Sequence, residues 1–151
     1  MQLRQVALSD PAVAPLLEWL ASAYRSWYGA PDEVVPGEFE PPSGAFVVLV
    51  DQDGETVAGG GFRRVEDDVC EVKRVWTAPG HRRRGHATRV LAELEALARE
   101  RGYRWLRLET GPAQPEAEAM YRALGYRHTP WQAHYPSALA FEKDLTSTPG
   151  E

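Results

Sequence analysis

Residues 70–98 of the chain, CEVKRVWTAPGHRRRGHATRVLAELEALA, decide its fold. The first residues alternate as in a strand, Pro79 and Gly80 predict a turn, and an amphipathic helix follows the basic run at 82–84. This order places a loop between a strand and a helix N-terminus. The first four N–H groups of a helix have no intrahelical partner and the helix dipole is positive there, so the sequence predicts an anion-binding loop.

The loop resembles the phosphate loop of the GCN5-related N-acetyltransferase (GNAT) family, whose pattern is Gln/Arg-x-x-Gly-x-Gly/Ala. Arg82, Gly85 and Ala87 match this pattern, and residues 73–75 match the strand before it. The resemblance runs from the first predicted strand to the last and is strongest over residues 70–126. It implies an acyl-CoA-dependent N-acyltransferase that carries an acetyl group from acetyl-CoA directly to a primary amine of a small molecule or peptide. The alternative is a non-catalytic acyl-CoA sensor or scaffold, which would bind CoA without turnover.

The same resemblance implies which residues hold the coenzyme. Loop N–H groups would bind the pyrophosphate, and backbone groups of the strand, where it separates from its neighbour, would pair with the pantetheine arm. The implied cofactor-binding residues are Val75, Trp76, Thr77, Arg82, Arg83, Arg84, Gly85, His86 and Ala87. A solvated basic patch is the other interpretation of the run. A P-loop is excluded, because His86 and Ala87 stand where it has Lys and Ser or Thr.

Residues 119–126 resemble the late motif of the family, in which a tyrosine protonates the departing CoA thiolate. Tyr121 occupies the place of that tyrosine. A free thiol has a pKa of about 8.5, so a nearby phenol can donate its proton as the C–S bond breaks. The alternative role of Tyr121 is to fill the core from an amphipathic helix.

Two glutamates are candidates for a general base. An amine has a pKa of about 10 and must lose a proton before it attacks a thioester. Glu71 shares a strand face with Lys73 by period two, and a base glutamate lies at a similar place in the histone-modifying branch of the family. An ion pair of Glu71 with Lys73 or an arginine is equally consistent with the sequence. Glu109, on the neighbouring strand, would act as a base, an acceptor ligand or a partner of Arg74.

Histidine and cysteine form no metal motif in this sequence. The only cysteine, Cys70, is expected to be a small buried strand residue. The four histidines lack the spacing of metal ligands: His81, His86, His128 and His134. His134, with Trp131 and Tyr135, would line the acceptor side or pack in an ordinary loop. The sequence therefore predicts no metal cofactor.

The predicted elements follow the order β-α-β-β-β-α-β-α-β, which indicates a mixed α/β fold. A single domain is expected over residues 1–145, with a frayed tail at 146–151, a sheet of about six to seven strands and about four helices. Strands are expected at 1–8, 45–50, 55–65, 69–77, 103–110 and 137–145, helices at 13–27, 87–98 and 115–124, and irregular segments at 29–44 and 126–135. The strand–helix–strand unit around the loop predicts a parallel pair. The glycines at 59–61 predict a bulge or a close contact within a strand.

Composition narrows the class of protein further. The formal net charge of −5 argues against a general nucleic-acid binder. The longest apolar run of the predicted strands, 45–50, is far too short to cross a membrane, and the N-terminus shows no export signal. With a single cysteine and no need for a disulfide, a cytoplasmic protein is expected. The sequence leaves a homodimer open.

Overall fold

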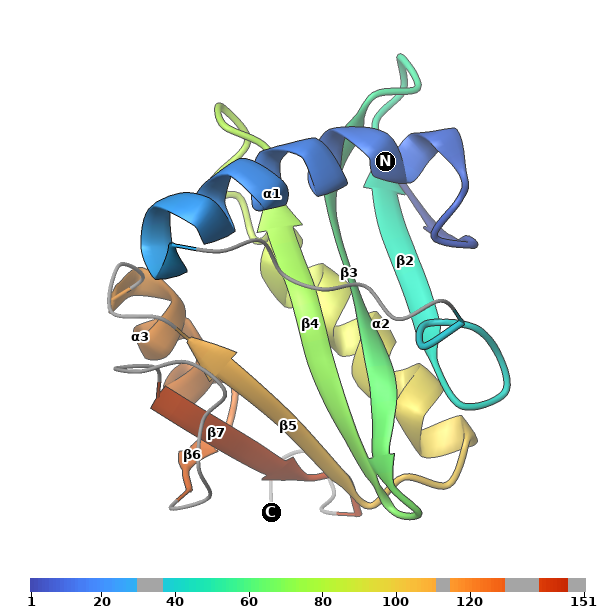
Figure 1. Cartoon of the computed structure of the whole chain (residues 1–151), viewed down its shortest axis with the longest axis vertical. Helices are drawn as coiled ribbons and strands as arrows, with labels where there is room; N and C mark the ends of the chain where they lie inside the picture. The colour runs from blue at the N-terminus through green and yellow to red at the C-terminus, as the bar shows by residue number, and fades with distance from the viewer. Residues whose placement is uncertain (30–36, 111–114, 130–138, 147–151) are drawn as a thin grey trace.

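The computed structural model describes residues 1–29, 37–110, 115–129 and 139–146, which form one mixed sheet with helices on both faces (Figure 1). The sheet has seven strands in the order β1-β2-β3-β4-β5-β7-β6. The strands are β1 (Gln2–Gln5), β2 (Ala45–Val50), β3 (Thr56–Glu66), β4 (Val69–Thr77), β5 (Trp105–Thr110), β6 (Arg127–His128) and β7 (Leu139–Asp144). Only β4 and β5 pair in parallel among these strands, as the strand–helix–strand unit predicts. The predicted mixed α/β fold is therefore confirmed.

The described residues include three α-helices and one turn of 3-10 helix, where the sequence predicted about four helices. They are η1 (Pro11–Val13), α1 (Ala14–Tyr28), α2 (His86–Glu100) and α3 (Pro115–Ala123). Asp10 caps η1 by accepting a hydrogen bond from the Ala12 N–H at 2.9 Å. The left-handed Gly29 ends α1 and donates its N–H to Arg25 O. None of the helices in the described ranges is long and apolar enough to cross a membrane.

The helices divide the core into two clusters, one on each face of the sheet. The cluster under α1 includes Leu16, Phe46 and Val48, and the cluster under α2 includes Val47 and Leu91. Figure 1 shows α1 crossing one face and α2 lying behind the other. All six residues of β2 are buried because both of its faces are covered, which explains the continuous apolar run in the sequence.

The three glycines of β3 meet both expectations for them. A Cβ at Gly59 would lie 2.8 Å from Leu16 Cδ1, and one at Gly61 would lie 2.5 Å from Phe46 Cδ2. The register with β4 also shifts between Gly59 and Gly61. Arg74 and Val75 of β4 together lie opposite Gly60, so the bulge is in β4. Gly59 thus lets α1 approach the strand, and Gly61 makes room for the ring of Phe46 beside the same bulge.

The end of the chain differs most from expectation. Residues 126–135 were predicted to be irregular, yet Arg127 and His128 form β6 against Glu142 and Phe141 of β7. A strand of two residues is too short to give a periodic pattern, and it forms because β7 offers an edge. The first strand is also shorter than predicted, since pairing with β2 covers only Gln2–Gln5.

Candidate active site

The site is built around the point at which β4 separates from β5. The two strands pair only from Val69 opposite Trp105 to Glu71 opposite Arg107. Beyond this point they diverge, and Figure 1 shows the wedge between their arrowheads. On this side of β4 the ladder with β5 stops at Glu71, so the backbone groups up to Thr77 are left to other partners. The resemblance implied a separation of the strands at this place, and the pairing confirms it.

The bulge lies in the separated half of β4 and changes the direction of its side chains. Arg74 has a left-handed backbone, with φ of 63°, and is buried. Val75 then points toward α2, since a Cβ at Gly60 would lie 3.2 Å from Val75 Cγ2 and 3.5 Å from Val90 Cγ1. Trp76 is buried in the cluster under α1. Successive side chains in this half of β4 therefore point to opposite faces of the sheet, and its backbone lies at the point where β4 and β5 diverge.

The loop from β4 to α2 has the backbone of an anion-binding site. Gly85 is the N-cap of α2, has φ of 79°, and no side chain caps the helix there. Arg83 is left-handed as well, with φ of 65°. Alternation of left-handed and other conformations turns successive N–H groups toward one concave side. No heavy atom lies within 4 Å of the position that a Cβ on Gly85 would take, so the loop is open around this residue. These residues fit a pyrophosphate.

The basic side chains of the loop are exposed, and the contacts of Arg82 show where its side chain lies. Arg82 donates from Nε to Thr77 O at 3.4 Å, and its Cζ lies 5.2 Å from the ring centroid of Trp19 in α1. Arg83 and Arg84 are exposed at the surface of the loop. The side chain of Arg82 therefore reaches α1.

His86, the first residue of α2, lies beside a second histidine. The ring centroids of His81 and His86 are 6.2 Å apart. Burial lowers the pKa of His86, and the charges of His81, Arg84 and Arg89 lower it further. His86 is therefore neutral near pH 7, in a position where a bound anion would favour its protonated form.

Tyr121 is buried on the α2 side of the sheet. Its ring centroid lies 5.9 Å from that of Tyr126 and 6.3 Å from that of Phe141. Burial raises the pKa of Tyr121 to about 12, so the phenol keeps its proton at neutral pH. Tyr121 belongs to the same cluster as Cys70, and Val75 packs against that cluster. The position satisfies both interpretations of this tyrosine, as a proton donor and as a core residue.

Glu71 is buried in an ion pair. Arg63 Nη2 lies 3.1 Å from Glu71 Oε1, and Arg63 Nη1 lies 2.9 Å from Glu38 Oε2. The sequence suggested Lys73 or an arginine as the partner, and the hairpin of β3 and β4 places Arg63 directly opposite Glu71. Sequence reasoning did not find Arg63, because only the register of the two strands identifies it.

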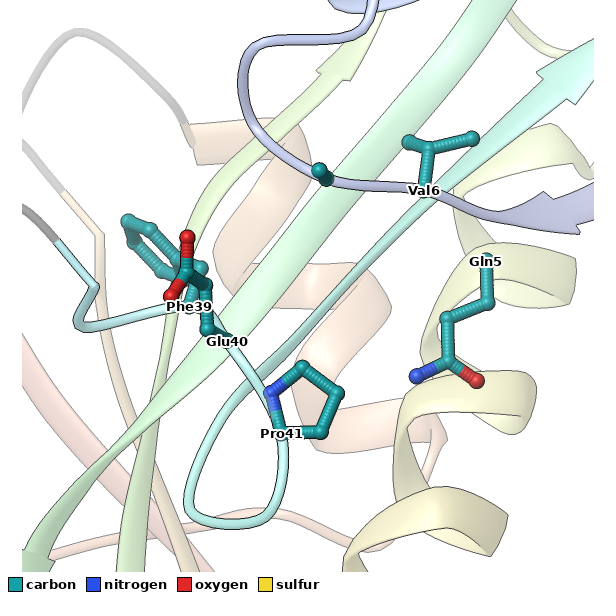
Figure 2. A pocket seen from close by; sticks show the side chains of 6 residues that line it. Gln5, Val6, Phe39, Glu40 and Pro41 are labelled. Atoms are coloured by element: carbon teal, nitrogen blue, oxygen red, sulfur yellow. The ribbon is translucent and has the colours of Figure 1, made fainter.

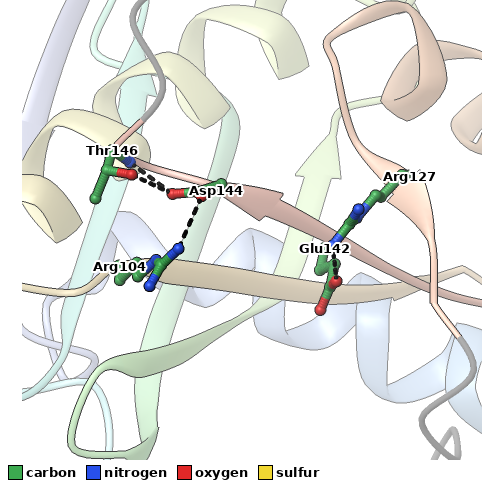
Figure 3. Close-up of polar contacts among 5 residues, drawn as sticks. All are labelled: Arg104, Arg127, Glu142, Asp144 and Thr146. Atoms are coloured by element: carbon green, nitrogen blue, oxygen red, sulfur yellow. Dashed lines mark hydrogen bonds and ion pairs between the residues drawn. The ribbon is translucent and has the colours of Figure 1, made fainter.

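The same register continues from β3 through β4, β5 and β7 to β6 as a ladder of alternating charges. Glu71 lies opposite Arg107, Arg107 opposite Glu142, and Glu142 opposite Arg127. Directly opposed residues share one face of a sheet, so this charge ladder and Arg63 lie on the α1 side. Figure 3 shows its outer end, where Arg127 Nη2 lies 2.9 Å from Glu142 Oε1 and Asp144 accepts from Thr146 nearby.

Glu109 lies outside the charge ladder. It follows Arg107 by two residues on β5 and therefore shares its face, but it lies past the last pair of β5 with β4. Its direct neighbour on β7 is Ala140. Of the two candidate bases, Glu109 is thus the one on the separated part of the sheet.

The remaining predicted site features lie elsewhere. Cys70 is a buried residue of β4, as predicted, and burial raises the pKa of its thiol to about 12. Trp131, His134 and Tyr135 lie outside the described residues. Within the described ranges, histidine, cysteine and carboxylate side chains form no cluster of three or more that could hold a metal.

An open pocket of about 480 Å³ lies away from the wedge (Figure 2). It is lined by Gln5, Val6, Ala7, Phe39, Glu40 and Pro41. These residues come from the end of β1 and from the loop before β2. In the sheet, β1 is an edge strand, and β2, β3 and β4 separate it from β5. None of the predicted site residues lines this pocket.

Comparison with known proteins identifies the class. Residues 13–126 match the model of the acetyltransferase (GNAT) family. The chain is 30% identical over 137 residues to the uncharacterized N-acetyltransferase YjgM of Escherichia coli, which covers 83% of this chain and 81% of that protein. The chain therefore belongs to the GNAT family and is an N-acetyltransferase of that type, as the loop motif predicted.

Solved structures agree with this assignment. A Klebsiella pneumoniae protein assigned as an acyl-CoA N-acyltransferase has 30% identity and a TM-score of 0.81, with 95% of this chain and 97% of that chain covered. An aminoglycoside 6'-N-acetyltransferase complexed with coenzyme A has a TM-score of 0.70 at 17% identity, with 99% of both chains covered. The second likeness concerns the fold alone.

Proposed function

We propose that this protein transfers an acetyl group from acetyl-CoA to a primary amine of a small molecule or peptide, by direct attack of the amine on the thioester. The observation that carries the proposal is the continuity of one segment. A strand whose second half leaves its parallel neighbour is joined by one short loop to a helix N-terminus without a side-chain cap, where Gly85 is the left-handed N-cap residue. An extended acyl-CoA needs both features, side by side.

The backbone of this segment supplies the binding groups. N–H groups around Gly85, His86 and Ala87 would hold the pyrophosphate, and the free backbone edge of β4 at Val75–Thr77 would pair with the pantetheine arm. A β4 N–H group aimed at the thioester carbonyl would stabilise the negative charge that develops on its oxygen. The bound coenzyme supplies the activated acetyl group.

Tyr121 is the proposed proton donor to the leaving thiolate. A phenol with a pKa of about 12 would be a poor donor to a thiolate in water, whose conjugate acid has a pKa of about 8.5. Burial also raises the pKa of the Cys70 thiol, which belongs to the same cluster as Tyr121, to about 12. A thiolate that leaves into these surroundings would be matched to the phenol, which favours proton transfer.

The base remains a choice between two glutamates. The ion pair with Arg63 supports a structural role for Glu71, whose side chain is 4% exposed. The place of Glu109 past the last β4–β5 pair supports Glu109, or solvent, as the route for the proton of the amine. We therefore propose Glu109 first and keep Glu71 as the alternative that mutation can test.

The test is a turnover screen with acetyl-CoA and a library of amines and peptides, followed by free thiol release. Calorimetric titration with CoA runs beside it. Binding together with amine-dependent thiol release supports the enzyme. Binding without release by any amine would favour a sensor or scaffold, and absence of binding would remove the coenzyme from the proposal. Propionyl-CoA and butyryl-CoA as donors establish the acyl-chain preference.

Because acyl-CoA chemistry and a free buried thiol both suit a reducing compartment, we propose that the reaction takes place in the cytoplasm.

A further inference from the structure

Arg82 is the first residue of the phosphate-loop motif, yet its side chain is engaged with other parts of the protein. Its Cζ lies 5.2 Å from the ring centroid of Trp19, within the range of a cation–π contact. Its Nε also donates to Thr77 O at 3.4 Å. One side chain therefore connects the loop, the end of β4 and the helix α1.

The helix that Arg82 reaches is the one that covers the other side of the site. Trp19 packs against the α1 cluster, which contains Trp76, and Ala78 packs against this cluster as well. Trp76 and Ala78 lie on either side of Thr77, whose carbonyl oxygen accepts the Arg82 hydrogen bond. Through this arrangement α1 contacts the end of β4 by packing and the loop by Arg82.

The loop backbone needs such support. Arg83, the next residue, is a non-glycine in the left-handed region with φ of 65°. A residue of this kind costs free energy unless its surroundings hold it in place. The side chain of Arg82 is fixed at its far end, so it restrains the backbone immediately before this strained position.

We propose that Arg82 is a positioning residue for the coenzyme: stacked on Trp19, it holds the phosphate loop in its binding conformation and makes CoA affinity depend on α1. This inference rests on the proposed function, since it assumes that CoA binds at the loop. The role differs from that of a phosphate ligand, because Arg82 then acts through the backbone N–H groups of its neighbours. Trp19, which touches no loop N–H in this scheme, becomes a determinant of CoA affinity.

The experiment measures CoA binding by calorimetry for the wild type, Trp19→Leu, Arg82→Lys and the double variant. A cation–π contact corresponds to a change of about 2- to 30-fold in an equilibrium constant. We expect Trp19→Leu and Arg82→Lys each to weaken CoA binding about 3- to 10-fold, with the double variant no weaker than either. In steady state the KM for acetyl-CoA should rise while kcat at saturation stays within about twofold. Trp19→Phe keeps an aromatic ring and should recover most of the affinity.

Trp105→Leu is the matched control, because Trp105 is also stacked with arginines, at 5.1 Å from Arg104 and 5.8 Å from Arg127, but lies on β5. It should leave CoA affinity unchanged. Wild-type affinity in Trp19→Leu, or additive losses in the double variant, would overturn the proposal, since Arg82 would then act on phosphate by itself. Arg82→Lys alters an exposed residue and should fold, so an unchanged CoA affinity in this variant would overturn the proposal even if Trp19→Leu folds poorly. A wild-type protein that does not bind CoA would instead refute the proposed function.

Discussion

The two halves of β4 differ although they belong to one strand. From Val69 to Glu71 the strand is paired with β3 on one side and β5 on the other, and its carboxylate is neutralised by Arg63. From Arg74 to Thr77 it is bulged, leaves β5 and leads into the phosphate loop. The paired half has ladders on both sides and an ion pair for its carboxylate, whereas the separated half has no ladder with β5.

The difference teaches where stability and function reside in this fold. Side chains that the sheet pairs across strands should matter for folding, and groups beyond the point of separation should matter for the reaction. Mutations in the two halves therefore ought to have opposite signatures. Single substitutions in each half test this contrast.

Gly85→Val should abolish CoA binding while the fold stays intact. A β-branched residue is strained at φ of 79°, and its side chain would enter the open concave side of the loop. No protein atom is close enough to clash, so the damage should stay local. Calorimetric titration with CoA and a melting curve measure the two effects.

Gly102→Val is the matched control for Gly85→Val. Gly102 lies just after the other end of α2, has φ of 86°, and also has no atom within 4 Å of its Cβ position. The backbone strain is the same, so both variants should melt at similar temperatures, but only Gly85→Val should lose CoA. Equal affinity in the two variants would mean that the loop is no phosphate cradle.

Tyr121→Phe should keep CoA affinity within a few-fold and lower turnover by about 10²–10⁴, the usual size of a general-acid contribution. The ring still packs on Tyr126 and Phe141, and only the proton donor is lost. Steady-state rates at several pH values measure the effect once an acceptor is known.

The control for Tyr121 is the neighbouring buried phenol. Tyr126 donates its hydroxyl to Glu95 Oε1 at 3.2 Å, so Tyr126→Phe should lower the melting temperature and leave kcat near the wild-type value. A Tyr121→Phe variant with full rate would leave Tyr121 as a core residue only.

The sequence predicted the local parts of this molecule well for a physical reason. A buried strand such as Ala45–Val50, a glycine that ends a helix, and a motif at a helix N-terminus each depend on residues that are close in the chain. Six of the seven strands in the described part of the chain follow from such short patterns, whereas the two residues of β6 carry none.

Contacts between distant segments could not be predicted in this way. The pairing of Arg63 with Glu71 depends on where the bulges shift the register, and the stacking of Arg82 on Trp19 depends on how α1 crosses the sheet. Each contact gives a partner to a residue that the sequence had proposed for catalysis or for binding, Glu71 and Arg82 respectively. The sequence proposed the residues of the site, and only the packing of distant segments shows what their side chains contact.

Glu71→Gln tests the paired half of β4. The variant keeps the shape and removes the charge that faces Arg63, which retains Glu38. A lost charge-assisted hydrogen bond should cost about 1–3 kcal/mol, or a fall in melting temperature of about 3–10 °C. The pH–rate profile should keep its shape.

Glu109→Gln is the counterpart on the separated half, and here we expect a lower rate and a flattened acid limb with little change in melting. The reverse pattern, with Glu71→Gln flattening the acid limb at normal CoA affinity, would make Glu71 the base. It would also break the contrast between the two halves of the strand.

His86 should give the smallest effect, a dependence of CoA affinity on pH. Burial and the charges of His81, Arg84 and Arg89 lower the pKa of His86 from its ordinary value of about 6.5 in the free protein. A bound pyrophosphate opposes these charges and raises that pKa again, so binding takes up a proton and should tighten, by less than about tenfold, as pH falls from 7.5 to 5.5. The stability of the free protein changes in the opposite direction. Because the pKa of His86 is lowered in the folded state, the protein loses stability as pH falls through about 6.5.

Dephospho-CoA is the suitable probe, because the phosphate monoester of CoA itself ionises near pH 6 and would mask the effect. His86→Gln should remove the dependence and the exposed His128→Gln should keep it, so a dependence that survives in His86→Gln would assign the proton to another group.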